Sequence, residues 1–302
     1  MRAEFAQAMV ALFHRRKDLV FITADLGYQV LEGVAEAYGD RYINAGIAEQ
    51  NAVSLAAGLA RAGHLPWVYS AAVFTVLRPY EQIRNDVCLH KLPVKLVGNG
   101  GGYSYGIMGA THHALEDVGA LRVLPNTRLY LPLVAADVAP VVNTMADDPL
   151  PNYLRLDQPA QLPGSIPRFA PWRRLKPGRS HVVVGMGPVL QGLYELGEPA
   201  LLDELEIWSV GTFPLDDIPA ELAASIAEKR GVITIEEHYR AGGLGEALSH
   251  SLLTSGIIPR SLVSLHAAGY PSGRYGSRRW HLAECGLAGP SLASRLEEVV
   301  RA

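Results

Sequence analysis

The run of small and apolar residues from Ala52 to Gly63 places the tightest constraint on how this chain can fold. It follows the segment Gly46-Ile47-Ala48-Glu49-Gln50-Asn51, and residues 41–44 before that have the pattern of a short strand. A helix of such residues has little polar face, so we expect it to be buried, with backbones approaching closely at Gly58. Glu49 would then lie where a strand passes into a buried helix, and a carboxylate there is costly unless it is paired. Alternatively, Glu49 only occupies a first helical turn, where the helix dipole favours an acid.

Strands and helices are predicted to alternate along the chain. Continuous apolar runs predict buried parallel strands, and helical spacing predicts the helices between them. The predicted strands are 20–24, 41–44, 65–69, 93–98, 129–131, 153–156, 181–187, 205–210 and 231–235, and the predicted helices are 3–14, 52–60, 80–89, from about 115, 135–145 and 246–254. This order predicts an α/β protein of two domains, each a mostly parallel sheet covered by helices.

A proline-rich, nearly patternless stretch suggests where the two domains divide. We expect a first domain over 1–158, a linker over 159–179 and a second domain over 180–302. The length of 302 residues is enough for two domains of ordinary size.

Composition excludes several classes of partner. The net charge is −3, and no basic run interleaved with aromatic residues points to nucleic acid. No apolar run of about 18 residues predicts a membrane span, and the N-terminus has no signal-peptide pattern. Cys88 and Cys285 lie far apart, so we expect free thiols in a reducing compartment and a cytoplasmic protein.

Three stretches carry candidate site residues. Asp25 follows the strand 20–24, either at the ligand-binding edge of a sheet or as a cap of the next segment. The glycine-rich loop 99–106 requires unusual dihedral angles but does not match a phosphate-binding pattern. His112 and His113 follow it, and we expect no metal site, because adjacent residues rarely point at one metal and no third ligand is obvious.

The segment 46–50, Gly-Ile-Ala-Glu-Gln, resembles the pyrimidine-domain signature of thiamine-diphosphate enzymes: transketolases, deoxyxylulose-phosphate synthases and the β subunits of 2-oxoacid dehydrogenases. In that family the glutamate bonds N1′ of the aminopyrimidine and so activates the cofactor, which supplies the chemistry. The resemblance implies that Glu49 is catalytic and that Ile47, Phe74 and Asp25 bind cofactor. Phe74 would stack on the aminopyrimidine; its alternative is core packing.

The same resemblance implies roles on the substrate side. Thr-His with a Glu four residues after the histidine is the family pattern at 111–116, which makes His112 a donor to the substrate oxygen and a proton shuttle. Arg155 would anchor substrate; its alternative is a salt bridge to Asp157 or to a neighbouring strand. His113 is a candidate substrate contact or a packing residue, and Met108 is the third candidate substrate contact.

The resemblance covers nearly the whole chain and corresponds to the second half of a transketolase: a pyrimidine domain plus a C-terminal domain. The family binds the diphosphate through Mg²⁺ at a Gly-Asp-Gly motif, which this sequence lacks; Gly39-Asp40-Arg41 has no second glycine. We therefore expect a separate partner subunit that holds the diphosphate and Mg²⁺, in an α₂β₂ heterotetramer. The role of His238, in a glutamate–glycine run typical of the C-terminal domain, stays open.

These residues predict a subunit of a split transketolase that transfers a two-carbon ketol, or a related acyl unit, between carbonyl compounds such as ketoses and aldehydes in carbohydrate or secondary metabolism. One alternative is the β subunit of a 2-oxoacid dehydrogenase, which would act on a 2-oxoacid; the Thr-His-His and Glu-Gln-Ile-Arg patterns favour transketolase. Another alternative is a non-catalytic assembly partner, against which the intact Glu49 argues, because a scaffold needs no buried acid.

Two departures from the family pattern predict the kind of substrate. Met108 stands where single-chain transketolases have an Asp that recognises a sugar hydroxyl, and Gly100 aligns with a His of the glycine loop. We therefore expect a less polar or unphosphorylated substrate. A Met108→Asp variant should gain activity toward polar ketose donors, measured as product formation in the assembled enzyme. Ordinary transketolase rates with xylulose phosphate in the unchanged chain would contradict this.

Overall fold

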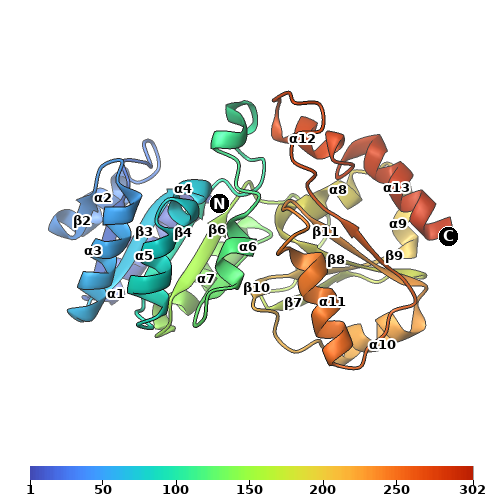
Figure 1. Ribbon diagram of the computed structural model, residues 1–302, viewed down its shortest axis with the longest axis horizontal. Coiled ribbons are helices and arrows are strands. Elements are labelled where there is room, and N and C mark those ends of the chain that lie inside the picture. Colours follow the sequence, from blue (N-terminus) through green and yellow to red (C-terminus); the bar gives the residue numbers. More distant parts are fainter. Residues whose placement is uncertain (302) are drawn as a thin grey trace.

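Two sheets, both mostly parallel, lie side by side in the computed structural model, which describes residues 1–301 (Figure 1). The first sheet has the strand order β10-β5-β6-β4-β3-β1-β2, and the second has the order β12-β11-β8-β9-β7. Every pairing is parallel except β10 with β5 and β7 with β9. The predicted α/β class is confirmed.

The inner strands β1, β3, β4 and β6 of the first sheet are buried on both faces, which is why they read as largely apolar runs, whereas the edge strand β2 is only partly buried. Along β1, Val20 and Ile22 pack in one core cluster while Leu19 and Phe21 pack in another. The strands are β1 (Leu19–Thr23), β2 (Tyr42–Asn44), β3 (Leu65–Ala71), β4 (Lys95–Asn99), β5 (Arg128–Tyr130), β6 (Asn152–Leu156) and β10 (Thr212–Phe213).

Helices cover the two faces of this sheet. The cluster that holds Phe21 is closed by α1 (Arg2–Arg15), α2 (Glu32–Tyr38) and α7 (Val138–Asp147). The cluster that holds Ile22 is closed by α3 (Glu49–Arg61), α4 (Ala72–Leu77), α6 (Asp117–Arg122) and the turns of α5 (Tyr80–Gln82), which continue as a π-helix over Ile83–Cys88. Short 3₁₀ turns lie at Gly39–Arg41, Gly106–Thr111, Ala135–Asp137 and Gly187–Leu190.

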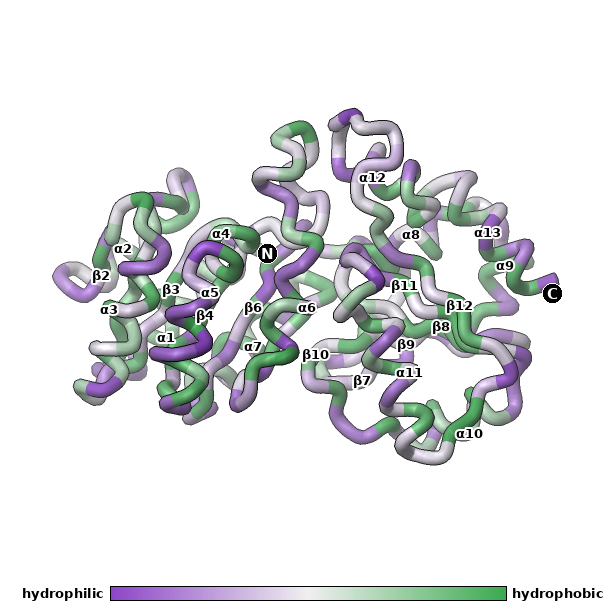
Figure 2. The backbone as a smooth tube through the Cα atoms, in the orientation of Figure 1, coloured by the Kyte–Doolittle hydropathy of each residue, from purple (hydrophilic) through white to green (hydrophobic). Residues whose placement is uncertain are grey.

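The second sheet is covered in the same way. Its strands are β7 (Trp172–Lys176), β8 (His181–Met186), β9 (Leu205–Val210), β11 (Gly231–Glu236) and β12 (Leu262–Leu265). One face packs against α10 (Ala220–Glu228) and α11 (Leu244–Thr254), and the other against α8 (Gln191–Tyr194), α9 (Pro199–Glu204) and α13 (Gly289–Arg301). The helix α12 (Arg278–Glu284) approaches the 3₁₀ turn at Gly106–Thr111. Figure 2 shows hydrophilic and hydrophobic stretches alternating along the chain, with hydrophilic stretches on helices as well as in turns.

The sequence interpretation omits the strand β12 and the helices α2, α4, α8, α9, α10, α12 and α13, and three further details differ. β7 lies within residues 159–179, where the apolar pattern indicates no strand, because it is an antiparallel edge strand with mixed burial. β10 follows β9 directly in the chain but pairs with β5 of the first sheet. The helix α3 is amphipathic rather than buried all round: Gly58 is exposed and no other group approaches it closely, so the predicted backbone contact there is wrong.

A buried ion pair ties the two sheets together. Arg173 of β7 donates two hydrogen bonds to Asp137, at 2.7 and 2.8 Å, and the side chains of both are nearly inaccessible to solvent. Asp137 also accepts the backbone N–H groups of Leu133 and Val134.

Within residues 1–301, no helix combines the length and the apolar character that crossing a membrane requires.

We predict that Arg173→Met strongly destabilises the fold. The change leaves the buried Asp137 carboxylate without its cation, and breaking a buried ion pair costs about 3–5 kcal/mol. Chemical denaturation would measure the free energy of unfolding. Arg179→Met is the matched control, because Arg179 is exposed and lies 4.0 Å from Glu204, so its loss should cost about 0–1 kcal/mol. Equal effects of the two substitutions would contradict the prediction.

Candidate functional site

The candidate site lies along one edge of the first sheet, where successive parallel strands end. Asp25 follows β1, Glu49 begins α3 after β2, Phe74 is on α4 after β3, and the glycine-rich loop follows β4. Because β1, β2, β3 and β4 are parallel, their carboxyl ends share this edge, which is where open α/β sheets bind ligands.

Glu49 is a buried carboxylate with one cationic partner. The residue is only 4 % exposed. Arg78 Nη1 lies 2.8 Å from one carboxylate oxygen and 2.9 Å from the other. The pairing relieves the cost of burying the charge, as the sequence requires of an acid at this position.

Phe74 lies between Arg78 and His112. The guanidinium carbon of Arg78 stands 3.7 Å from the centre of the Phe74 ring, a stacked cation–π contact. The His112 ring meets Phe74 edge to face at 5.2 Å. Glu49, Phe74 and His112 are therefore brought together, with Arg78 between the carboxylate and the aromatic ring.

His112 is held by its own turn. Its Nδ1 lies 2.9 Å from the hydroxyl of Thr111, and its backbone N–H donates to the carbonyl of Gly109. The Tyr105 ring contacts His112 at 5.7 Å and fills the space beside Gly100. Gly100 has φ +78°, and a Cβ there would lie 2.4 Å from the Tyr105 ring, so no larger side chain fits at Gly100 in this arrangement.

Three other predicted site residues lie exposed in loops at or near this edge. Asp25, with φ 54°, exchanges hydrogen bonds with the Asn44 side chain rather than capping a helix. Ile47 is 76 % exposed in the loop before Glu49, and Met108 is 49 % exposed in the 3₁₀ turn before His112. Large apolar side chains that face solvent in this way are available to a ligand or a partner.

His113 is buried, unlike His112. Its Nε2 donates to the carbonyl of Gly106 at 2.8 Å, so its Nδ1 accepts from the Tyr270 hydroxyl at 2.9 Å. Burial lowers the pKa of His113 to about 4, which keeps the ring neutral near pH 7. These contacts favour the packing alternative over substrate binding, because both ring nitrogens are already engaged.

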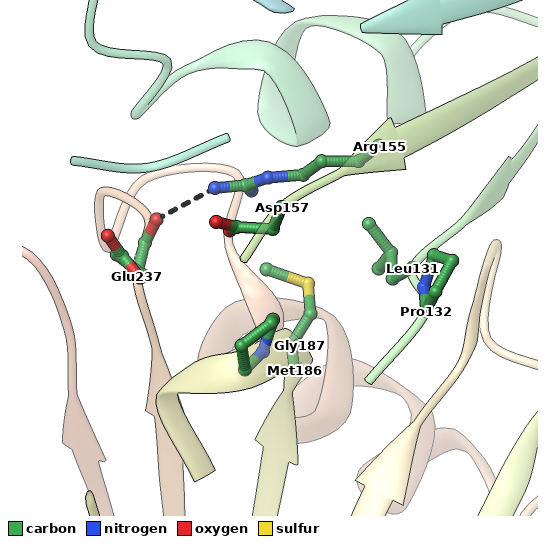
Figure 3. Close-up of a pocket in the computed structure, with 8 residues that line it drawn as sticks. Leu131, Pro132, Arg155, Asp157, Met186, Gly187 and Glu237 are labelled. Atoms are coloured by element: carbon green, nitrogen blue, oxygen red, sulfur yellow. Dashed lines mark hydrogen bonds between the residues drawn. The ribbon is translucent and has the colours of Figure 1, made fainter. Parts of the chain in front are cut away.

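Arg155 is also buried, between the two domains, at 7 % exposure. Its Nη1 pairs with Asp117 at 3.3 Å, and its Nη2 donates to the backbone carbonyl of Glu237 at 3.2 Å (Figure 3). The cavity beside it has room for about one water molecule, with a volume near 10 Å³, and is lined by Leu131, Pro132, Asp157, Met186, Gly187, Pro188 and Glu237. The geometry favours the salt-bridge alternative, with Asp117 as the partner instead of Asp157.

The sequence interpretation missed a group of residues that fasten the glycine-rich loop to the second domain. The Glu237 carboxylate accepts the backbone N–H of Tyr103 at 2.7 Å and is paired with Arg278 of α12. The Tyr103 hydroxyl donates to the carbonyl of Gly269 at 2.7 Å. The glutamate run at 236–237 is the signal that could have indicated a buried acid here.

His238, whose role the sequence left open, joins the two domains. Its Nε2 accepts the backbone N–H of Gly119 at 3.2 Å, so Nδ1 carries the proton and donates to the carbonyl of Tyr239 at 3.0 Å. Burial lowers the pKa of His238 to about 4. A neutral ring with both nitrogens engaged serves packing between domains.

Arg78 is the missed residue at the site itself. It comes four residues after Phe74, a spacing that places two side chains on one helical face, and this was the available signal. The guanidinium is planar, delocalised and an N–H donor. A flat ring that donates to a carboxylate could therefore occupy the same place between Phe74 and Glu49. The aminopyrimidine of thiamine diphosphate fits this description.

Comparison with known proteins supports the same assignment. Residues 1–161 match the model of the transketolase pyrimidine-binding domain. An apulose-4-phosphate transketolase subunit from Phocaeicola vulgatus is 30 % identical over 87 % of this chain and 86 % of its own length. A 1-deoxy-D-xylulose-5-phosphate synthase from Kitasatospora griseola is 33 % identical over 98 % of this chain, which spans 48 % of that protein.

Solved structures agree. A split-gene transketolase, described as an inactive β4 tetramer, superposes with a TM-score of 0.82 at 29 % identity, covering 99 % of this chain and 97 % of that one. The transketolase of Campylobacter jejuni superposes over 99 % of this chain and 46 % of its own, with a TM-score of 0.76 at 15 % identity, which shows a shared fold. The predicted resemblance is confirmed: the chain belongs to the transketolase family of thiamine-diphosphate enzymes, as the C-terminal subunit of a split, transketolase-like transferase.

Proposed function

We propose that this chain supplies the aminopyrimidine half of a thiamine-diphosphate site in a two-chain enzyme that transfers a two-carbon ketol, or a related acyl unit, between carbonyl substrates. One observation carries the proposal: the Glu49 carboxylate and the Phe74 ring face hold a planar N–H donor between them. The cofactor, when bound, supplies a carbon nucleophile that attacks the carbonyl carbon of the donor.

The residues of this chain would handle orientation and protons. The buried Glu49 would bond N1′ and share its proton, which a solvated carboxylate would do less strongly. Phe74 would fix the plane of the ring by stacking. His112, 5.2 Å from Phe74 between ring centres, would donate to the substrate oxygen on which negative charge develops. Asp25 and Ile47 would border the cofactor.

The diphosphate and its Mg²⁺ would be held by a partner subunit. Among residues 1–301, no three His, Cys, Asp or Glu side chains are grouped to hold a metal ion, and the sequence has no Gly-Asp-Gly motif. We propose an α₂β₂ heterotetramer in the cytoplasm. We also propose a first domain over 1–158 followed by a linker that is shorter than 159–179, because β7 (Trp172–Lys176) pairs into the sheet of the second domain. The exposed Ile47 and Met108 would face the partner or the substrate.

We propose ketoses and aldehydes as the substrate class. Two of the relatives are transketolase subunits named for apulose 4-phosphate, a sugar phosphate, which supports a carbohydrate substrate. Met108 would meet the donor, and its apolar side chain favours a less polar group there. Arg155 and His113 are buried and already paired, so neither belongs to the proposed substrate site. No feature of the site favours a 2-oxoacid over these substrates.

Glu49→Gln should separate the catalytic role from a structural one. The amide keeps the shape but cannot share a proton, so removing this acid–base group should slow hydrogen–deuterium exchange at the cofactor C2 about 10²–10⁴-fold. Cofactor affinity should fall only modestly. The exchange is followed by NMR in the assembled enzyme, and the melting temperature is recorded alongside.

Glu81→Gln is the control for this substitution, because Glu81 is an exposed acid on α5 whose carboxylate, among the residues that the structure describes, accepts a side-chain hydrogen bond from Asn85 alone. It should leave exchange unchanged. The alternative role predicts a different result: exchange in Glu49→Gln as fast as in the unchanged chain, with only stability lowered. Glu49 would then be an acid in a first helical turn that contributes about 0.3–1 kcal/mol to stability.

Activity should depend on the partner. Alone, the chain should bind thiamine diphosphate weakly and show no turnover; with a subunit that carries the Gly-Asp-Gly motif, it should form a heterotetramer and turn over. Light scattering gives the mass of each assembly, and product analysis by mass spectrometry gives the activity. Full activity from this polypeptide by itself would refute the split-enzyme proposal.

A further inference from the structure

Arg78 already makes both contacts that the proposed cofactor role requires of Glu49 and Phe74. Its Nη1 is bonded to both oxygens of Glu49, at 2.8 and 2.9 Å. Its guanidinium lies 3.7 Å from the centre of the Phe74 ring, which is stacking distance. One flat group therefore fills the space between this carboxylate and this ring face.

We infer that Arg78 and the aminopyrimidine are alternative occupants of one site, so that the Arg78 side chain must leave before the cofactor ring can bind. This inference rests on the proposed function. A ring face holds one stacked group at a time, and the carboxylate oxygens that would accept from the cofactor are the ones to which Arg78 donates.

The position of Arg78 makes this exchange feasible. The residue caps the C-terminal end of α4, and its side chain is 43 % exposed, so it has solvent to swing into. Beyond Glu49 and Phe74, no other side chain fixes its guanidinium among the described residues. The neighbouring groups, in contrast, are fixed by contacts that do not involve Arg78: Glu49 is buried at the start of α3, and Phe74 packs on the buried cluster of Ala72, Val73 and Ala114.

The exchange also explains how the site tolerates a buried carboxylate. Glu49 would be an uncompensated buried charge if nothing donated to it. Arg78 donates to Glu49 when no ligand is bound, and a ligand that donates to Glu49 can replace it. Either Arg78 or the cofactor ring can thus donate a hydrogen bond to Glu49. Arg78 competes with the ring, and the fraction of molecules in which Arg78 holds the site sets the apparent affinity for the ring.

Competition makes a quantitative prediction. Apparent affinity falls by the fraction of molecules in which the site is free, so Arg78 occupying the site nine-tenths of the time would weaken aminopyrimidine binding about tenfold. Removing the guanidinium should recover this factor. A ligand that relied on Arg78 for a contact would show the opposite change.

The test measures binding of 4-amino-5-hydroxymethyl-2-methylpyrimidine, the aminopyrimidine portion alone, to the full chain by NMR titration. The chains compared are the unchanged protein, Arg78→Ala and Arg78→Met, and Arg84→Ala. Arg84 is the matched control: it is exposed, it lies six residues further along, and within residues 1–301 its side chain hydrogen-bonds only to Asn85. Both Arg78 variants should bind more tightly than the unchanged protein, by about tenfold for an Arg78 occupancy of nine-tenths, and Arg84→Ala should not change affinity.

Guanidinium ion provides a second measurement that does not depend on the side chain's tether. In Arg78→Ala, low concentrations of guanidinium chloride should refill the space and return pyrimidine affinity toward that of the unchanged protein; sodium chloride at equal ionic strength should not. Melting temperatures show whether each variant is folded, and Arg78→Met covers the case in which the alanine variant is not.

Each remaining outcome overturns the inference. Equal affinity in the unchanged protein and both Arg78 variants would mean that Arg78 does not compete, and would leave the proposed function standing. Weaker binding in the Arg78 variants would make Arg78 a cofactor ligand. No binding to any folded variant would overturn the inference together with the cofactor role of Glu49 and Phe74.

Discussion

The buried carboxylate of Glu237 is the interaction on which the geometry of the site depends. It accepts the Tyr103 N–H from the glycine-rich loop and pairs with Arg278 of α12, while the backbone carbonyl of the same residue accepts from Arg155 at the end of β6. One position in the second domain thus fixes a loop and a strand of the first. A buried acid of this kind is tolerated only because its oxygens are bonded on both sides.

The turn that carries His112 is packed on the same part of the second domain. His113 bonds Tyr270, and a Cβ on Gly109 would lie 2.9 Å from the ring of Tyr275. The carbonyl of Gly109 accepts the backbone N–H of His112, the candidate proton donor. Contacts from the second domain, which holds neither Glu49 nor Phe74, therefore set the position of His112. The second domain therefore does more than enlarge the molecule: it orients a residue of the site.

Much of the architecture could be predicted because its signals are local. Apolar runs such as 20–24 and 65–69 are buried on both faces, which only a parallel sheet between helices provides. Glu49, Phe74 and His112 were identified from short motifs, and the fold brings them to one edge. β7, β10 and β12 lie outside the predicted strands, because edge strands of mixed burial and a two-residue strand leave almost no periodic pattern.

Side-chain partners were harder to predict than elements. The burial of Arg155 depends on Asp117 and Glu237, which lie 38 and 82 positions away in the chain, and no local pattern reports contacts at that separation. The pairing of Arg78 with Glu49 spans 29 positions and two strand–helix connections. Burial and pairing of charges follow from how the layers pack, so they become visible only when the layers are in place.

The crossing of β10 into the first sheet has a consequence for how the halves of this chain can be separated. β5 would be the edge of that sheet if the chain ended before β10, and an open edge strand with unpaired N–H and C=O groups is a template for pairing with other chains. Two residues donated by the second half close this edge. A fragment cut at the boundary between the domains would expose this edge and would also lose the Arg173–Asp137 pair and the part of the core that both sheets share, so protection against aggregation and folding together tie the two halves into one polypeptide.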